Sequence, residues 1–202
     1  MKKMESTLTN MIVVLVGVAL VTGCLLAVVN HITEGPKAAQ KTLALAEGIR
    51  TVMGSSDVTV SKTDTVCMTV NGKQTELIVH RVAGGGGAAV ESQTMGFGGD
   101  LRVLVGFADD GTITGYTILQ HAETPGLGAK AATWFQKDGK GNIIGKKAVK
   151  PLAVSKDGGE VDAITASTIT SRAFLKAVNQ AYAAYMQQSA DAHTGATKIK
   201  KG

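Results

Sequence analysis

A charge-free apolar run from Met11 to Val29 constrains this 202-residue chain more than any other feature. As an α-helix these 19 residues would extend over about 28 Å, which matches the hydrocarbon core of a bilayer. Lys2 and Lys3 precede the run, and the next Lys or Arg is Lys37. Because positively charged flanks stay in the cytoplasm, we expect a single-pass protein of the inner (cytoplasmic) membrane. Its predicted parts are a cytoplasmic N-terminus at 1–10, a transmembrane helix at 11–29 and an extracytoplasmic remainder.

Two other readings of the apolar run stay open. A cleaved signal peptide is one, although the run exceeds the usual length of such a segment. The other is a lipid anchor on Cys24, because Val21-Thr22-Gly23-Cys24 resembles a lipoprotein cleavage box. Apolar residues continue to Val29 after this box, where a lipoprotein normally turns polar. Cys24 and Cys67 are too few for a metal site of their own, and a structural disulfide is not expected.

The residues after the apolar run indicate one α+β domain. Gly35-Pro36 predicts the start of a juxtamembrane helix within 30–54, since proline is favoured in a first turn. Several antiparallel strands and a terminal helix follow, which is typical of a mainly antiparallel sheet with flanking helices. We expect this domain at 55–187 and a polar tail at 188–202.

Turn residues between apolar stretches predict two antiparallel pairs of strands. Asn71-Gly72 is a strong signal for a two-residue hairpin. Asp109-Asp110-Gly111 predicts the second turn. The expected strands are Thr65–Val70 with Gln74–Val82, and Leu101–Phe107 with Thr112–Gln120. The glycine run Gly84–Gly87 is expected to form a loop.

Val161–Tyr185 combines a carboxylate, a cluster of hydroxyls and an amphipathic helix pattern. The carboxylate is Asp162, and the hydroxyls belong to Thr165, Ser167, Thr168, Thr170 and Ser171. Apolar residues then recur at spacings of three and four, which predicts a helix with Ser167 or Thr168 as N-cap. The first N–H groups of such a helix have no internal partner and favour a phosphate. The hydroxyls could equally serve only as helix caps.

A second candidate site is the loop His121–Gly128, which leaves a strand and bends at Pro125-Gly126. His121 and Glu123 could be two metal ligands, but no third ligand accompanies them at a convincing spacing. They could also form an acid/base pair beside a nucleophilic Thr168. A hydrogen-bonded pair that fixes a sharp turn is the third interpretation.

Both stretches resemble one flavoprotein family. Asp162-Ala163-Ile164-Thr165-Ala166-Ser167-Thr168 is similar to the flavinylation motif D-x-x-[S/T]-G-A-T, which occurs in the G subunit of the Rnf ion-translocating oxidoreductase and in the C subunit of the sodium-translocating NADH:quinone reductase. His121–Gly128 resembles the H-x-E-T-P-G-L-G signature of the same domain, and the likeness extends over Gly96–Tyr185. The sequence departs from the motif at Ala166, where Gly is usual, and at Ser167, where Ala is usual.

The resemblance implies an electron-transfer subunit in which FMN is attached to Thr168 through a phosphoester. Thr168 would then be the acceptor for a separate flavin transferase and not a catalytic residue. The other subunits of an Rnf complex would be the partners. The implied cofactor-binding residues besides Thr168 are Asp162, Thr165, Ser167, Thr170, Ser171, His121, Glu123, Thr124, Gly126, Leu127 and Gly128.

Other functions remain as alternatives. Length favours the Rnf subunit, because its quinone-reductase relative is usually longer. A membrane-anchored binding module, or a hydrolase or acyltransferase using Thr168 with His121, would carry no flavin. The net charge of +5 is modest, and no aromatic residues interleave with a basic stripe, so nucleic-acid binding is not expected.

Overall fold

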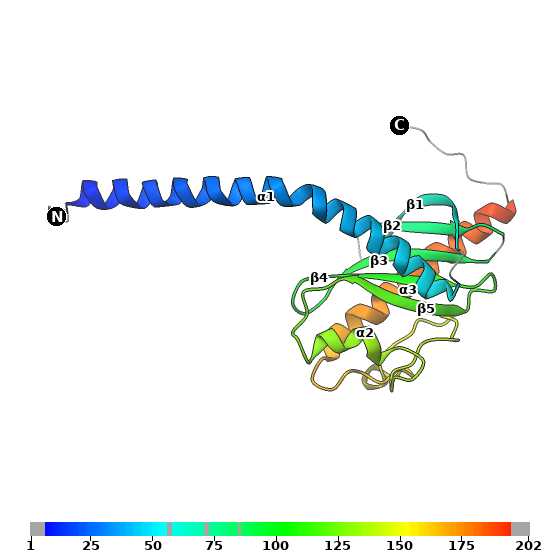
Figure 1. Ribbon diagram of the computed structural model, residues 1–202. Helices are drawn as coiled ribbons and strands as arrows, with labels where there is room; N and C mark the ends of the chain where they lie inside the picture. The colour runs from blue at the N-terminus through cyan, green and yellow to red at the C-terminus, as the bar shows by residue number, and fades with distance from the viewer. Residues whose placement is uncertain (1–6, 56–57, 71–72, 85, 195–202) are drawn as a thin grey trace. The chain divides into compact units, whose positions relative to one another are not determined.

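The computed structural model describes residues 7–55, 58–70, 73–84 and 86–194 (Figure 1). In chain order the elements are α1 (Leu8–Met53), β1 (Val60–Val70), β2 (Lys73–Val82), β3 (Ala88–Met95), β4 (Asp100–Phe107), β5 (Ile113–Gln120), the 3₁₀ turn η1 (Gly128–Lys130), α2 (Ala131–Trp134), the 3₁₀ turn η2 (Ser155–Asp157) and α3 (Thr168–Thr194). The chain divides into two compact units, residues 1–44 and 45–202.

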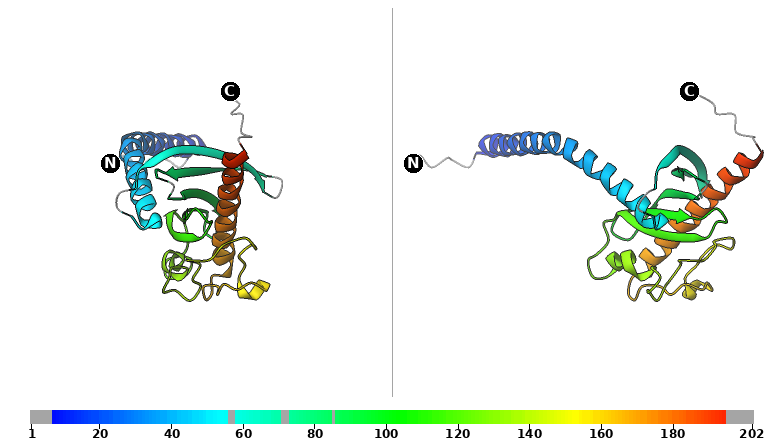
Figure 2. Two further views of the ribbon diagram at one scale, coloured as in Figure 1. Left: turned by 90° about the vertical axis from the view of Figure 1, so that its right-hand side faces the viewer. Right: turned by 45° about the vertical axis from the view of Figure 1, so that its right-hand side comes forward.

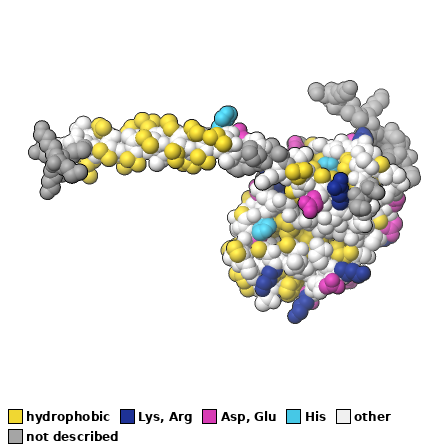
Figure 3. Space-filling model, viewed as in Figure 1, with side chains coloured by type: hydrophobic (Ala, Val, Ile, Leu, Met, Phe, Trp, Pro, Cys, Tyr) yellow, Lys and Arg dark blue, Asp and Glu magenta, His cyan; other side chains and the backbone are white. Residues whose placement is uncertain are grey.

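The first unit is helical from Leu8 onward. The stretch Leu8–Gly35 is long and apolar enough to cross a membrane, with a mean hydropathy of 3.0 and no buried residues in its most apolar window. Apolar side chains cover most of its visible surface (Figure 3). The membrane helix expected at 11–29 lies within this stretch.

The prediction that a separate juxtamembrane helix starts at Gly35-Pro36 is wrong, because α1 continues through this dipeptide to Met53. An internal proline removes one backbone hydrogen bond of a helix. Ending one helix and starting another would leave several backbone groups at each new end without an intrahelical partner. The continuous helix avoids that larger loss.

The second unit is built on a five-stranded antiparallel sheet in the order β1-β2-β3-β4-β5. The two predicted strand pairs are confirmed as β1 with β2 and β4 with β5. Val70 lies opposite Lys73, although the predicted turn residues Asn71-Gly72 lie outside the described residues. Gly85 of the predicted glycine loop also lies outside them.

The central strand β3 was not predicted, because its sequence lacks the alternation of apolar and polar residues. Its first five residues are all buried, since both faces of the sheet are covered there. Ala88 and Val90 belong to one cluster of buried apolar residues and Ala89 to another. A strand buried on both faces has no polar side to mark it in the sequence.

The larger cluster lies between the sheet and α3, which packs along β3 and β4 (Figure 2). Phe174 of α3 is its centre. The Phe174 ring stacks on Phe135 with centroids 4.3 Å apart and meets Tyr116 edge-on at 4.7 Å. These aromatic contacts fix the start of α3 against the segment that follows β5.

The smaller cluster lies on the opposite face of the sheet, where the last turns of α1 pack. Ile49 and Val52 contact this face with Ala89 and Leu104. The Thr114 hydroxyl donates to the Val52 carbonyl at 2.7 Å. A Cβ built on Gly106 would lie 2.6 Å from the same carbonyl oxygen, so a side chain there would push the helix away. The sheet is therefore the middle layer between two helices.

α3 continues to Thr194, so the first residues of the predicted tail at 188–202 are helical instead. Helix patterns in a sequence are read from apolar spacing, and the polar residues after Gln187 give no such signal. A helix already nucleated on a packed face can extend into polar residues at little further expense. Residues 195–202 lie outside the described part.

Candidate functional site

The buried carboxylate of Glu123 joins three segments that are distant in the sequence. Its Oε1 accepts the backbone N–H groups of Phe97 at 2.7 Å and of Gly98 at 3.4 Å, in the turn between β3 and β4. Its Oε2 accepts the hydroxyl of Thr170 in the first turn of α3 at 2.7 Å. Glu123 therefore holds the predicted loop, the glycine-rich turn and the start of α3 in one place.

Glycines let these segments approach the carboxylate closely. A Cβ built on Gly96 would overlap Glu123 Oε1, and one built on Gly128 would lie 2.5 Å from Oε2. A Cβ on Gly98 would overlap the Ala122 carbonyl. The absence of side chains at Gly96, Gly98 and Gly128 therefore leaves room for Glu123 and its loop. Gly126 differs, because its Cβ would meet nothing and only its positive φ of 75° favours glycine.

The start of α3 is fixed by serine hydrogen bonds. The Ser167 carbonyl accepts the Ser171 N–H at 3.0 Å, the bond expected of an N-cap residue. The Ser171 hydroxyl donates to that carbonyl at 2.9 Å and accepts the Ile164 N–H at 2.9 Å. Of the two N-cap candidates the structure selects Ser167, and Thr168 becomes the first helical residue.

Thr168 differs from the neighbouring hydroxyls in its surroundings. Thr170 and Ser171 are fully buried and hydrogen-bonded, and Ser167 is buried as well. Thr168 is half-buried. Within the described part of the chain, the backbone N–H groups of Thr168, Ile169 and Thr170 have no backbone acceptor. A reachable hydroxyl therefore lies next to amides that could hold an anion.

Ala166 has a φ of 63°, the one positive φ of a non-glycine residue in the described ranges. This left-handed conformation crowds the Cβ of any L-residue. It explains why a motif of this kind has glycine at this position, which the small size of the residue alone does not. The turn places Ser167 and Thr168 at the head of α3.

The remaining predicted residues lie at the surface. Asp162, Thr165, His121, Thr124, Gly126 and Leu127 are all exposed. The Asp162 carbonyl accepts the Trp134 indole N–H at 2.8 Å, and its carboxylate accepts the Ser155 hydroxyl at 3.4 Å. The Thr124 carbonyl accepts the N–H groups of Leu127 and Ala129, which closes the turn at Pro125-Gly126. These residues belong to the loops that precede α2 and α3.

Exposed apolar side chains lie on the segments that Glu123 brings together. They are Phe97 in the glycine-rich turn, Leu127 in the loop and Ile169 in the first turn of α3, which are 67%, 42% and 54% exposed. Sequence reasoning singled out Leu127 but not Phe97 or Ile169. A single exposed apolar residue carries little information, and only the fold shows that these three lie on segments that Glu123 joins.

The non-flavin chemistries find little support in this geometry. His121 Nδ1 accepts the backbone N–H of Glu123 at 3.3 Å, and no hydrogen bond joins His121 to Thr168 among the described residues. Glu123 is occupied by its three donors. No group of three metal-ligating side chains occurs in the part of the chain that the structure describes. The third interpretation is a hydrogen-bonded pair of His121 and Glu123 at a sharp turn. Within the described ranges His121 bonds only the backbone of Glu123, and the Glu123 carboxylate binds the glycine-rich turn and Thr170 instead.

Comparison with known proteins identifies relatives of this chain. Residues 96–183 match the family described as the FMN-binding domain. The G subunit of the Na(+)-translocating ferredoxin:NAD(+) oxidoreductase complex of Acetobacterium woodii is 30% identical over 191 residues, which cover 85% of this chain and 88% of that one. The G subunit of the ion-translocating oxidoreductase complex of Methanosarcina acetivorans is 31% identical over 182 residues, covering 86% and 92%.

A solved structure is also similar to this chain. It is that of the C subunit of the Na(+)-translocating NADH-quinone reductase from Parabacteroides distasonis, with 24% identity and a TM-score of 0.47. The alignment covers 66% of this chain and 79% of that one.

Proposed function

Because this chain belongs to the family of G subunits of ion-translocating oxidoreductase complexes, we propose that it transfers electrons through FMN covalently bound to Thr168. The bond is a phosphoester between the FMN phosphate and Thr168 Oγ1. The observation that carries this proposal is the difference among the hydroxyls, since Thr168 is reachable while Thr170 and Ser171 are buried and engaged. Thr165 is exposed but lies before the helix begins.

The residues around Thr168 fit a flavin phosphate and an aromatic ring. The first-turn amides of α3 and the positive end of its dipole stabilise an anion. Phe97, Leu127 and Ile169 offer apolar surface beside it. The hydrogen bonds of Glu123 hold these three segments together. When bound, FMN supplies the reversible uptake and release of electrons, while the protein supplies attachment, orientation and electrostatics.

The role of the chain is that of a redox subunit and not of an enzyme acting alone. Other components of an ion-translocating complex of the Rnf type are its partners, and a separate flavin transferase forms the phosphoester. The relative from Acetobacterium woodii is aligned over most of its own length, which favours this assignment over the C subunit of a quinone reductase. Thr168 takes no part in turnover beyond holding the cofactor.

The membrane anchor is the apolar stretch Leu8–Gly35. Lys2 and Lys3 before it keep the N-terminus in the cytoplasm, so the flavin domain lies on the extracytoplasmic side. A covalent bond suits this location, because a dissociable cofactor would be lost by dilution outside the cell. The anchor and the bond together keep the redox group at the membrane.

Thr168→Val tests the attachment site. The substitution keeps the shape of the side chain and removes the hydroxyl, so it should abolish covalent FMN. Because Ser167 is the N-cap, the free energy of unfolding should fall by less than about 1 kcal/mol. The wild-type chain, produced together with its flavin transferase, should gain the mass of FMN less one water. The added mass should lie in the tryptic peptide 157–172.

Matched variants separate the five hydroxyls of that peptide. Thr168→Ser should keep some modification, because it retains an oxygen at the same place. Thr165→Val and Ser167→Ala should be modified like the wild type, and peptide fragmentation assigns the residue. If Thr168→Val still fluoresces as a flavoprotein after denaturation, the assignment to Thr168 is wrong.

A further inference from the structure

The sheet is split between β2 and β3. These strands pair over four positions, from Ile78 opposite Glu91 to Arg81 opposite Ala88. Beyond Ile78, β2 continues to Lys73 in regular pairing with β1, and beyond Glu91, β3 continues to Met95 in regular pairing with β4. In the same register the next partners would be Leu77 with Ser92, Glu76 with Gln93, Thr75 with Thr94, and Gln74 with Met95. These four pairs are open, and we call the two segments Gln74–Leu77 and Ser92–Met95 the fork.

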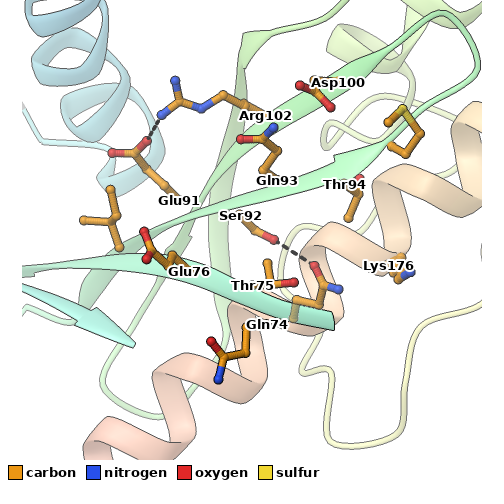
Figure 4. Close-up of a pocket in the computed structure, with 13 residues that line it drawn as sticks. Gln74, Thr75, Glu76, Glu91, Ser92, Gln93, Thr94, Asp100, Arg102 and Lys176 are labelled. Carbon is orange, nitrogen blue, oxygen red and sulfur yellow. Dashed lines mark hydrogen bonds and ion pairs between the residues drawn. The ribbon is translucent and has the colours of Figure 1, made fainter. Parts of the chain in front are cut away.

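A cavity of about 640 Å³ fills the fork. Figure 4 shows residues of both strand segments around it, with Lys176 of α3 at one side. Among the described residues, no strand neighbours the inner edge of either segment, so alternate residues present N–H and C=O groups without a strand partner to the cavity. Four register positions correspond to about 13 Å of extended chain. The fork therefore has the length and the polarity of a short β-strand.

The two edges themselves contain nothing that forbids pairing. No proline occurs in either segment and no like charges face each other, and Thr75 with Thr94 would be a favourable cross-strand pair. Side chains of β3 are hydrogen-bonded to α3 along this segment. The Thr94 hydroxyl donates to the Ala173 carbonyl at 3.0 Å, and the Ser92 hydroxyl donates to the buried Gln180 side chain at 3.3 Å (Figure 4). These bonds fix β3 against α3 beside the open pairs.

We propose that the fork is the docking site for an extended segment of another subunit of the complex, which enters as an additional strand between β2 and β3. Backbone hydrogen bonds to both edges provide the affinity, as in other cases of strand addition. Unpaired charges beside the fork provide selectivity. Lys176 and Glu76 have no ion-pair partner among the described residues. The entering segment is polar, with an acidic side chain toward α3 and a basic one toward Glu76.

This proposal rests on the membership of a multi-subunit complex proposed above, but not on the flavin. Strand insertion can therefore be tested in complexes that contain either the wild-type chain or Thr168→Val. Failure of flavin attachment removes the covalent cofactor and leaves backbone protection in the fork unchanged. Failure of strand insertion removes backbone protection in the fork and leaves the covalent cofactor in place.

Amide hydrogen exchange compares the full chain alone in detergent with the intact purified complex. Alternate amides of the fork should exchange at least tenfold more slowly in the complex, both with the wild-type chain and with Thr168→Val. The matched control is the outer edge of β1, an edge strand of the same sheet. Equal exchange in the two samples overturns the proposal, as does equal slowing of the β1 control, which would indicate general burial.

Photo-cross-linking identifies the occupant. A benzoylphenylalanine replacing the exposed Gln93 should cross-link, in the complex, to one segment of another subunit that peptide mapping identifies. The same amino acid replacing Lys137, an exposed residue distant from the fork in the sequence, should not reach that segment. A cross-link to residues 195–202 of the same chain overturns the proposal, and so does the absence of a product.

Discussion

At the scale of single residues, the hydroxyl cluster before α3 divides into structural and reachable members. Ser171 ties the turn to the helix through two hydrogen bonds, and Thr170 ties the helix to Glu123. Ser167 provides the N-cap carbonyl. A residue that is already hydrogen-bonded and buried would have to give up those bonds to be modified. Among the described residues the Thr168 hydroxyl has no such bond to lose, which is why the proposed attachment falls on it.

Ala166→Gly should stabilise the protein. Relief of the left-handed strain exceeds the greater chain entropy of glycine, so the free energy of unfolding should rise by about 0.5–1 kcal/mol. Urea denaturation of the flavin-free chain, followed through the fluorescence of the single tryptophan, measures the change. Ala163→Gly is the control, since Ala163 has no positive φ and should become less stable. Equal destabilisation of both variants would contradict the strain at Ala166.

Glu123 joins three segments through its hydrogen bonds, and this role predicts different outcomes for two substitutions. Glu123→Ala removes the acceptor of three hydrogen bonds in a buried site and should lower the free energy of unfolding by about 2–4 kcal/mol. Glu123→Gln keeps an acceptor for the amides, and the Thr170 hydroxyl can turn to accept from its NH₂ group. The loss should then be smaller by at least about 1 kcal/mol.

Double-variant measurements show whether Glu123 acts through Thr170. Thr170→Val should cost less in the Glu123→Ala background than in the wild type, because the shared hydrogen bond is already gone. Flavin content should fall in Glu123→Ala and be largely kept in Glu123→Gln. Thr165→Val, at an exposed position, should stay within about 0.5 kcal/mol of the wild type. An equal loss of unfolding free energy in Glu123→Ala and Glu123→Gln would show that the hydrogen bonds of Glu123 do not join these segments.

At the scale of elements, β3 carries a polar cluster on the face of the sheet opposite α3. His80 Nε2 lies 2.9 Å from Glu91 Oε1, Arg102 donates to Glu91 Oε2 at 2.7 Å, and the Thr63 hydroxyl lies 3.2 Å from His80 Nδ1. Burial by itself would raise the pKa of Glu91. The hydrogen bonds and charges of His80 and Arg102 outweigh burial and hold that pKa below its usual value.

Glu91 should therefore contribute a pH-dependent part of the stability. Its lowered pKa in the folded chain means that the contribution is present above the ordinary value of 4.5 and is lost as the pH falls below it toward the folded-state pKa. The difference in unfolding free energy between wild type and Glu91→Gln should be largest near neutral pH and shrink in acid. Urea titrations across this range measure it. Glu76→Gln, at an exposed position on β2, is the control, and a parallel trend in both variants would contradict the prediction.

At the scale of the whole molecule, an apolar helical stretch and a sheet domain share one chain, and the proposed placement of the N-terminus and the domain on opposite sides of the bilayer is testable. A reporter active only outside the cytoplasm, fused after Gly202, should be active, and a reporter that works only inside should be silent. Replacing Lys2 and Lys3 with Glu should reduce this asymmetry, because it removes the positive flank. Cytoplasmic activity of the wild-type fusion would refute the orientation. A lipid-modified Cys24 at a mature N-terminus would replace the spanning anchor.

The sequence by itself determined the features that depend on neighbouring residues. The apolar run of α1, the pairing of β1 with β2, the strands β4 and β5 and the start of α3 all follow from local periodicity, turn residues and caps. The two motifs also indicated the family that the relatives identify. They named Thr168 without showing why that hydroxyl differs from its neighbours.

Tertiary structure decided the features that depend on contacts between distant segments. Glu123 meets partners 26 and 47 residues away, and no spacing rule predicts such contacts. β3 has no polar face in the sequence because helices cover both of its faces, and the sequence does not show that its pairing with β2 ends after Glu91. The sequence shows only that Ala166 is small. Its conformational strain comes from the positive φ that the turn imposes. Local propensity acts through adjacent residues, whereas burial, close approach and strain arise only when the chain has packed.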